Sequence, residues 1–309
     1  MKRLLSIALA FAMYESWARQ PTDEERRDSD NAPICRVPSA MKPCFRLGVA
    51  GQTFVKKTTD EVLRAMKIAD LRFLCLKDSH FSYDSSEVEI VSFKRKCLDF
   101  GVECAVGGPL YFKDEAGARR LFSFAKRYDM KTVVGVPYAV KEGAVDVFGP
   151  NRIECDELIG IVERLVREYD IRFAIHNHGP DMPDLFPDSE AIWRRIKDRD
   201  RRIGFCLDVG HERRSGKDPI VTIHRFADRI YDIHLKNIRV DPQINYAFPA
   251  PRGELDIPNI LQALEDVGYC GICHIEYERD FDDNLMGLVE SVGYYRGCMD
   301  MLRHGSRKD

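Results

Sequence analysis

The sequence lacks an excess of basic residues. Its 47 lysines and arginines are outnumbered by 50 aspartates and glutamates, which gives a formal net charge of −3. The basic residues are also scattered among acidic ones instead of gathering in one stripe. A protein that binds nucleic acid has to neutralise a phosphate backbone, so this composition argues against nucleic acid as a partner.

The sequence also lacks an apolar run long enough to cross a bilayer. The longest N-terminal run, LLSIALAFAM (4–13), follows Lys2 and Arg3 and is too short to span. Small residues precede a candidate cleavage point after Ala18, so we expect residues 1–18 to be a secretory signal peptide. A fragment of amphipathic helix behind a poorly chosen start codon is the alternative. We therefore expect a periplasmic or exported protein with no membrane insertion after processing, and a cytoplasmic one as the alternative.

The ten cysteines lack the spacing of a metal or redox site. CGIC (270–273) is a single CxxC with no second pair, which is too little for a zinc ribbon or a thioredoxin-like site. Cys75, Cys104, Cys206 and Cys273 fall inside expected strands, where cysteine behaves as a small hydrophobic residue. The positions therefore argue against disulfides, and the cysteines do not settle the compartment.

From residue 44 onward one unit recurs, namely a short apolar strand, a polar turn and an amphipathic helix. Residues 19–43 are polar and unpatterned, and we interpret them as a linker. The expected strands cover residues 45–50, 71–76, 102–106, 131–136, 171–175, 202–207, 230–235 and 271–276. Most of them are continuous apolar runs, as is typical of parallel strands covered on both faces.

Eight strands alternating with helices over residues 44–309 match the count and size of a (β/α)8 barrel. Helix signals support the alternation: Thr58 and Glu61 form a capping-box pattern, and Gly101 follows a helical segment. An open doubly wound sheet is the rival fold, but no glycine-rich phosphate turn follows the first strand. We therefore predict an α/β protein whose single folded domain is a TIM barrel.

Metal-ligating side chains stand where four consecutive expected strands end, and six of the eight histidines lie within strands or at their ends. His176, Asp208, His234 and Glu276 each come from a different strand. Catalytic groups of such barrels lie at the carboxyl ends of the strands. Two imidazoles and two carboxylates suit Zn²⁺, Mn²⁺, Co²⁺ or Fe²⁺ better than Mg²⁺ or Ca²⁺. The sequence therefore predicts one divalent metal ion held by these four residues.

At this point the motifs resemble those of a known family. HNHG (176–179), LDVGH (207–211), HLK (234–236), RGELD (252–256) and the glutamate of the last strand resemble the sugar phosphate isomerase/epimerase superfamily. These are the xylose isomerase-like TIM barrels, relatives of endonuclease IV, and the resemblance covers nearly all of residues 44–300.

The resemblance implies that Asp208, His234 and Glu276 bind the metal. It also implies a fourth ligand, a glutamate, where this sequence has His176. The family's two glutamates shuttle protons on opposite faces of the substrate, whereas a metal-bound imidazole is a poor base. Proton transfer would then fall to Glu276, His211, His178 or a lysine.

Four residues are the predicted catalytic groups, namely Glu276, His211, Lys236 and His178. His211 resembles the family histidine that contacts a substrate hydroxyl or carbonyl; its alternative role is to orient Asp208. Lys236 shares a face of its strand with His234, from which it can stabilise an enolate oxygen or transfer a proton. Its alternative is a solvated lysine at the rim.

Three further residues are the predicted substrate contacts. Lys77 and His80 follow the second expected strand. Arg252 lies in a loop that resembles the family's substrate-clamping loop, with a surface arginine as the alternative. His274 stands two residues before Glu276, and we expect it deeper in the barrel. The expected partner is a small carbohydrate, and a homo-oligomer is left open.

One metal ion beside acid and base groups suits chemistry at the carbon next to a carbonyl. We predict a sugar isomerase or epimerase that works on a ketose or keto-sugar through an enediolate. A keto-sugar or keto-glycoside lyase or dehydratase with the same site is the alternative. An endonuclease IV-like repair enzyme is a remote third, because it needs more histidine ligands and a basic face. A sugar-binding protein without catalysis is disfavoured, since the Asp208, His234 and Glu276 set is intact.

Overall fold

The structure, a computed structural model, describes residues 44–144, 149–239 and 247–305. The expected signal peptide (1–18) and linker (19–43) lie outside the described residues, so both stay predictions. None of the described helices combines the length and the apolar character needed to traverse a lipid bilayer.

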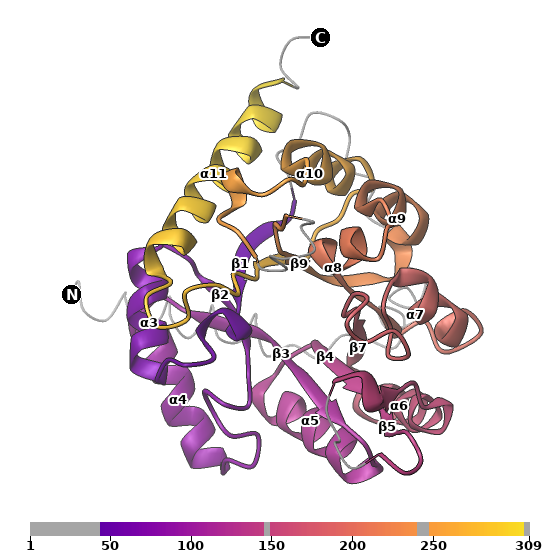
Figure 1. Ribbon diagram of the computed structural model, residues 1–309. Coiled ribbons are helices and arrows are strands. Elements are labelled where there is room, and N and C mark those ends of the chain that lie inside the picture. Colours follow the sequence, from indigo (N-terminus) through magenta and orange to yellow (C-terminus); the bar gives the residue numbers. More distant parts are fainter. Residues whose placement is uncertain (1–43, 145–148, 240–246, 306–309) are drawn as a thin grey trace, which may run out of the picture. The chain divides into compact units, whose positions relative to one another are not determined.

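Eight parallel strands close into a barrel, as predicted, and helices surround it (Figure 1). Around the barrel the strand order is β1-β10-β9-β8-β7-β4-β3-β2. The strands are β1 (Arg46–Ala50), β2 (Phe73–Leu76), β3 (Glu103–Phe112), β4 (Thr132–Pro137), β7 (Arg172–His176), β8 (Ile203–Asp208), β9 (Ile230–Leu235) and β10 (Ile272–Ile275). Each expected strand is present, and its ends lie within two residues of the expected ones except in β3. The first and last strands pair, with Arg46 beside Ile272, and this pairing closes the barrel.

The helices of the outer layer begin where the sequence offers capping groups. They are α3 (Thr59–Ile68), α4 (Glu87–Asp99), α5 (Glu115–Tyr128), α6 (Asp156–Tyr169), α7 (Ser189–Ile196), α8 (Val209–Arg214), α9 (Pro219–Phe226), α10 (Ile257–Asp266) and α11 (Leu285–Gly305). Thr58 and Glu61 form the expected capping box before α3. Gly101 follows α4 with a φ of 74°, a conformation that favours glycine.

Three features differ from the sequence-based expectation. β3 runs to Phe112, six residues beyond its expected end, so that GGPLYF continues the strand. Two short strands, β5 (Ala139–Val140) and β6 (Arg152–Ile153), pair antiparallel beside the barrel. Helix α8 follows β8 directly, because the Asp208 side chain accepts a hydrogen bond from the backbone of His211 and caps it. The first and third differences place additional side chains at the carboxyl end of the barrel.

Two apolar layers hold the fold together. The larger one fills the space between strands and helices, with Phe122, Phe173 and Leu165 fully buried in it. A smaller cluster inside the barrel contains Cys75, Val106, Val134, Ala174 and Cys206. Small side chains fit there because the interior of an eight-stranded barrel is filled by side chains and leaves no pore.

The expectation of no disulfides is wrong at one pair of cysteines. Cys44, just before β1, is bonded to Cys270, just before β10. β1 and β10 are neighbours in the barrel, which brings residues 226 positions apart in sequence close together. Cys75, Cys104, Cys206 and Cys273 are buried and free, as their strand positions predicted. Cys270 is therefore held in a disulfide, and Cys273 is packed in the larger apolar layer, so that CGIC forms no common site.

Candidate metal centre and active site

The four predicted metal ligands converge at the carboxyl end of the barrel. One donor atom from each of His176, Asp208, His234 and Glu276, hereafter the donor cluster, lies within 4.8 Å of every other. Nε2 of His176 is 3.0 Å from Nδ1 of His234 and 3.8 Å from Oδ2 of Asp208. The same Nε2 is 3.7 Å from Oε2 of Glu276. His176 and Asp208 are the last residues of β7 and β8, His234 is the last but one of β9, and Glu276 directly follows β10.

The donor cluster fits a divalent ion. All four side chains are buried, and Asp208 is fully shielded from solvent. Oδ2 of Asp208 has no hydrogen-bond partner among the described residues, which is costly for a buried carboxylate oxygen. Two imidazole nitrogens and two carboxylate oxygens are a donor set typical of zinc, manganese, cobalt or iron sites. The identity of the metal stays a prediction.

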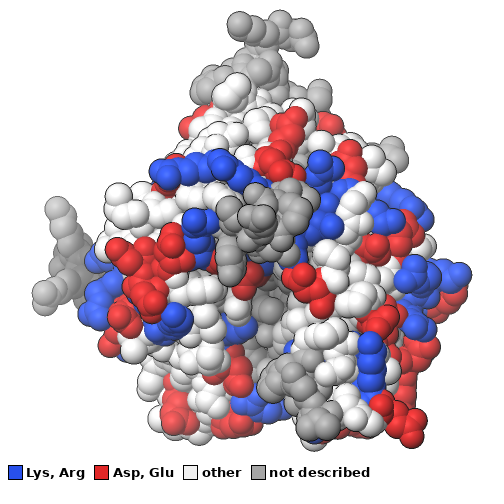
Figure 2. All heavy atoms as spheres, viewed as in Figure 1, with Lys and Arg blue, Asp and Glu red and all other residues white. Residues whose placement is uncertain are grey.

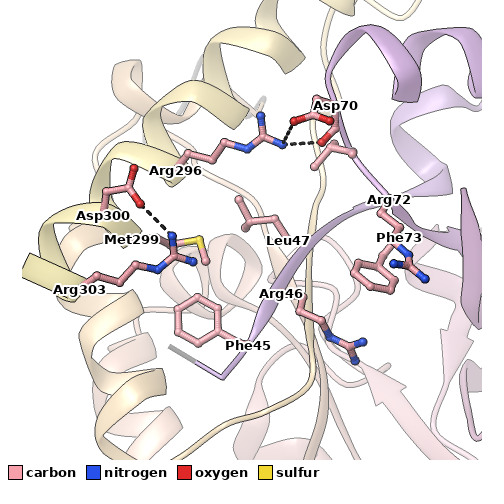
Figure 3. A pocket seen from close by; sticks show the side chains of 11 residues that line it. Phe45, Arg46, Leu47, Asp70, Arg72, Phe73, Arg296, Met299, Asp300 and Arg303 are labelled. Atoms are coloured by element: carbon pink, nitrogen blue, oxygen red, sulfur yellow. Dashed lines mark hydrogen bonds and ion pairs between the residues drawn. The ribbon is translucent and has the colours of Figure 1, made fainter. Parts of the chain in front are cut away.

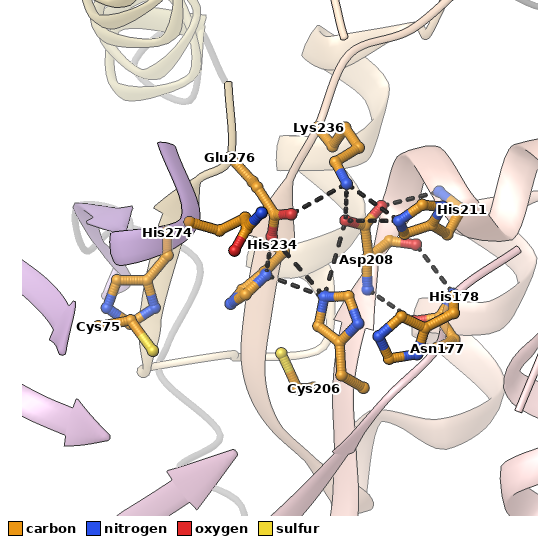
Figure 4. Close-up of polar contacts among 12 residues, drawn as sticks. Cys75, Asn177, His178, Cys206, Asp208, His211, His234, Lys236, His274 and Glu276 are labelled. Atoms are coloured by element: carbon orange, nitrogen blue, oxygen red, sulfur yellow. Dashed lines mark hydrogen bonds and ion pairs between the residues drawn. The ribbon is translucent and has the colours of Figure 1, made fainter. Parts of the chain in front are cut away.

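Lys236 joins the donor cluster to further acid and base groups (Figure 4). Its Nζ lies 2.9 Å from Oε1 of Glu276, 3.4 Å from Oδ2 of Asp208 and 2.6 Å from Oε2 of Glu278. Nε2 of His211 is 2.9 Å from the same Nζ. Lys236 is therefore a buried cation among three carboxylates, and the alternative of a solvated rim lysine is wrong. Glu278 follows Glu276 by two residues, and its carboxylate also contacts Lys236.

Burial and the neighbouring charges set the protonation of these groups. Burial alone favours neutral Lys236, but the surrounding carboxylates raise its pKa well above the usual value. Burial likewise disfavours ionised Glu276, yet Lys236 and His234 hold the pKa of Glu276 well below its usual value. Burial lowers the pKa of His178 and of His211, and the charge of Lys236 lowers both further. The site thus combines an ionised glutamate, a charged lysine and two neutral imidazoles.

His178 stands beside the donor cluster and contacts Tyr111. The rings of His176 and His178 have centroids 4.6 Å apart, so both histidines lie on the inner side of the barrel, as their spacing predicted. Nε2 of His178 is hydrogen-bonded to the hydroxyl of Tyr111. The guanidinium of Arg152 lies over the Tyr111 ring, 4.5 Å from its centroid. Tyr111 enters the site because β3 is longer than expected, and the sequence analysis did not select it as a site residue.

A buried network behind the donor cluster fixes the backbone of Asp208. The side-chain oxygen of Asn177 accepts from the Asp208 amide at 2.8 Å, and its amide group donates to the Asp208 carbonyl at 3.1 Å. The same amide donates to Glu212, which also accepts from Ser189 and Thr222. Asn177 therefore links β7 to β8. No local sequence pattern signals such a bond, because it depends on the two strands being neighbours.

Lys77 and His80 both follow β2, but they have different hydrogen-bond partners. Nζ of Lys77 donates to Oε1 of Gln52 at 2.6 Å, and burial lowers the pKa of this lysine. His80 is buried, and its Nε2 lies 2.8 Å from the carbonyl oxygen of Phe54. Lys77 is close enough to Glu276 for that charge to act on it. Of this pair, Lys77 is the better placed to address a substrate.

Arg252 does not reach the donor cluster, so its predicted contact with substrate is not supported. It ends the short helix η4 (Ala250–Arg252), and its Nε is paired with Oε1 of Glu290 on α11 at 2.7 Å. The side chain is 63% exposed. This position agrees with the alternative of a surface arginine, and a contact between Arg252 and substrate stays a prediction.

A different pocket lies at the other end of the barrel (Figure 3). It has a volume of about 390 Å³ between the start of β1, the start of β2 and helix α11. Two of its arginines are in ion pairs with residues of the same lining, Arg296 with Asp70 at 3.0 Å and Arg303 with Asp300 at 2.9 Å. Active sites of TIM barrels lie at the carboxyl ends of the strands, so this pocket is not the candidate active site.

The surface carries charges of both signs. Figure 2 shows lysines and arginines interspersed with aspartates and glutamates on the face that it draws. Ion pairs link many of them across helices, such as Arg119 with Glu168 and Arg195 with Asp156. The mixture of charges on this face agrees with the nearly equal numbers of basic and acidic residues in the sequence.

Comparison with known proteins agrees with the fold. A family model described as a xylose isomerase-like TIM barrel matches residues 63–298. The inosose dehydratase of Geobacillus kaustophilus is 25% identical over 281 residues, which cover 76% of this chain and 88% of that protein. The rhizopine catabolism protein MocC of Rhizobium meliloti is 30% identical over 139 residues. That match covers 40% of this chain and spans less than half, 42%, of MocC.

Solved structures share the fold at low sequence identity. An L-ribulose 3-epimerase superposes with a TM-score of 0.64 at 13% identity, covering 86% of this chain and 99% of the epimerase. The IOLI protein, whose structure contains a bound zinc atom, gives a TM-score of 0.61 at 15% identity. The second match covers 86% of this chain and the whole of the IOLI chain, at 100%. These likenesses demonstrate the shared barrel fold.

Proposed function

This chain belongs to the xylose isomerase-like TIM barrel family, and on that premise we propose that it is a metal-dependent enzyme acting on a polyhydroxylated ketone. The substrate class is a keto-sugar or a cyclic polyol ketone. The donor cluster carries the proposal, because its four donor atoms lie within 4.8 Å of one another at the catalytic end of the barrel. A bound divalent ion would supply Lewis acidity toward a carbonyl oxygen and its neighbouring hydroxyl.

The side chains around the donor cluster suit proton transfer at the carbon next to a carbonyl. Glu276 is ionised and buried, so a carboxylate is ready to accept a proton. Lys236 bridges Glu276 and Glu278 and is placed to donate a hydrogen bond to an oxygen that gains negative charge. His211, beside Lys236, is placed to contact a substrate hydroxyl.

We propose elimination of water as the first candidate reaction. An epimerase needs an acid or base on each face of the substrate, whereas elimination needs one base for the α-proton and one acid for the leaving hydroxyl. Glu276 serves as the base, and the ammonium group of Lys236 as the acid. A metal-bound His176, in the position where the family resemblance implies a glutamate, is not available as a second base. The relative matched over most of its length, from Geobacillus kaustophilus, is named an inosose dehydratase.

An isomerase or epimerase is the second candidate, and one observation favours it. Tyr111 comes from β3, which lies opposite β9 in the order of the barrel strands. The hydrogen-bonded pair of Tyr111 and neutral His178 thus offers a proton-transferring group on a second side of the site. The structural neighbour named L-ribulose 3-epimerase agrees with this candidate.

One experiment separates the candidates. The purified protein is loaded with Zn²⁺, Mn²⁺, Co²⁺ or Fe²⁺ and incubated in D₂O with a panel of ketoses, 3-keto-glycosides and inososes. Elimination yields a product lighter by one water molecule, whereas isomerisation or epimerisation yields a sugar of unchanged formula that carries deuterium on carbon. The proposal is wrong if no metal-loaded preparation of the wild type changes any compound of the panel, so that the wild type cannot be distinguished from Asp208→Asn.

We further propose that the protein is exported. The Cys44–Cys270 disulfide supports this, because structural disulfides persist in oxidising compartments. Fractionation of producing cells is expected to find the protein outside the cytoplasm, beginning near Arg19, with one disulfide. Recovery from the cytoplasm with an uncut N-terminus and all thiols reduced would contradict it.

A further inference from the structure

A second polar layer lies beneath the donor cluster inside the barrel. It consists of Asp232, His274, Cys75 and Cys206, each with 0% exposure. Figure 4 shows Cys75, Cys206 and His274 on the side of His234 that faces away from Lys236. An ionised carboxylate in such a place is expensive unless hydrogen-bond donors surround it. The neighbours of Asp232 therefore indicate what it does.

Asp232 lies between two histidines. Its Oδ1 accepts from Nδ1 of His274 at 2.8 Å, and its Oδ2 lies 3.5 Å from Nε2 of His234. The thiol of Cys206 points to the same Oδ2 at 3.6 Å. Both carboxyl oxygens of Asp232 therefore face a possible donor, Oδ1 toward His274 and Oδ2 toward His234 and Cys206.

The strand periodicity places this carboxylate directly behind a ligand of the donor cluster. Asp232 and His234 are two residues apart on β9 and so share the inner face of the barrel. His274 pairs with His234 in the register between β9 and β10 and precedes Glu276 by two residues. Each of these two strands therefore carries one residue of the donor cluster and, one step deeper, one residue of the polar layer.

The two ring nitrogens of His234 face different groups. Nδ1 is 3.0 Å from Nε2 of His176 and contacts Oε2 of Glu276, so Nδ1 is the nitrogen within the donor cluster. A neutral imidazole that offers a lone pair at Nδ1 must carry its proton at Nε2. Nε2 is buried and makes no hydrogen bond among the described residues, and Oδ2 of Asp232 approaches it to 3.5 Å. The carboxylate of Asp232 is the acceptor on that side.

We infer that Asp232 is a positioning residue for His234: it accepts the Nε2 proton and so presents Nδ1 to the metal, while His274 orients Asp232. The inference rests on the proposed metal-dependent function. Carboxylates that hold the outer nitrogen of a metal-binding histidine fix the ring orientation and the tautomer. Asp232 itself touches neither metal nor substrate.

The decisive variant is Asp232→Asn. An asparagine has the same shape but offers one oxygen for the two N–H groups of His234 and His274, so one of them loses its acceptor. We expect the dissociation constant for Zn²⁺ to rise by roughly 10- to 100-fold, measured by competition with a chromophoric chelator. Val134→Thr, a change of nearly the same size in the apolar cluster inside the barrel, is the matched control and is expected to bind Zn²⁺ as wild type does. Circular dichroism in EDTA checks that both variants are folded.

A second measurement needs only a folded wild type and a reference variant. Long-range ¹⁵N–¹H correlation spectra of the Zn²⁺-loaded protein, compared with those of His234→Gln, are expected to assign the Nε2–H tautomer to His234. An Nδ1–H tautomer overturns the inference, as does Asp232→Asn that is folded and binds Zn²⁺ within threefold of wild type. If metal analysis finds two ions per wild-type chain and only one in Asp232→Asn, the second polar layer binds a metal ion itself, and the inference is wrong. A wild type that binds no metal refutes the proposed function as well, so the two failures are distinguishable.

Discussion

The two halves of the barrel are built alike but differ in the side chains that they place at the catalytic end. Strands β7, β8, β9 and β10 deliver His176, Asp208, His234 and Glu276, which all meet in the donor cluster. The half formed by β1–β4 contributes Lys77 after β2 and Tyr111 near the end of β3. Because strand packing requires only apolar residues, the polar strand ends are free to specialise. We infer that one half holds the metal and the other addresses the substrate.

The largest expected effect follows from breaking the metal-holding half. Asp208→Asn keeps an acceptor for the cap of α8 but removes a charge from the donor cluster. We expect kcat/KM to fall on the order of 1,000-fold, because a metal contributes several kcal/mol of transition-state stabilisation. Elemental analysis of the dialysed variant is expected to find far less than the roughly one ion per chain of wild type. Retention of both the metal and activity would refute the division between the halves.

Substituting one buried lysine in each half, Lys236 or Lys77, compares how much each lysine contributes to the free energy of unfolding. In EDTA, Lys236→Gln leaves Asp208, Glu276 and Glu278 without their shared cation, and we expect the free energy of unfolding to fall by about 3–5 kcal/mol. Lys77→Gln loses only the bond to Gln52, and the expected loss is below about 1.5 kcal/mol. Urea denaturation monitored by circular dichroism measures both. Equal losses would mean that the two lysines occupy equivalent environments.

A smaller effect is expected from the substrate-facing half. Tyr111→Phe removes the hydroxyl that contacts His178 and leaves the ring beneath Arg152 in place. The loss of one hydrogen bond predicts a fall in kcat/KM of about three- to tenfold. Affinity for Zn²⁺ should stay as in wild type, because Tyr111 is not in the donor cluster. A loss of Zn²⁺ affinity in this variant would mean that Tyr111 helps to hold the metal, as the residues of the other half do.

The smallest effect is expected at Arg252, which belongs to neither half. Its guanidinium is exposed and paired with Glu290 on α11. Exposed ion pairs contribute little, so Arg252→Ala is expected to keep kcat/KM and Zn²⁺ affinity within about twofold of wild type. A marked rise in KM for the true substrate would instead restore Arg252 as a substrate contact.

The periodic parts of the molecule were predictable, and the parts that depend on neighbouring strands were not. The strands and the donor cluster followed from apolar runs that end in histidine or a carboxylate, because parallel barrel strands bring their carboxyl ends together. The ion pair of Arg252 with Glu290 was not predicted, because the two residues are far apart in sequence. The Cys44–Cys270 bond was missed because it requires the closure of β1 onto β10.

The sequence by itself determined the barrel, the identity of the four donor residues and the absence of a basic stripe. Each of these follows from local order along the chain: hydrophobic periodicity, residue type at strand ends and composition. Tertiary structure alone decided which groups surround the donor cluster. Lys236 among three carboxylates, Tyr111 on His178 and Asp232 behind His234 all join different strands or loops. Burial and contact between such segments fix their protonation and their role, and neither is encoded in local sequence.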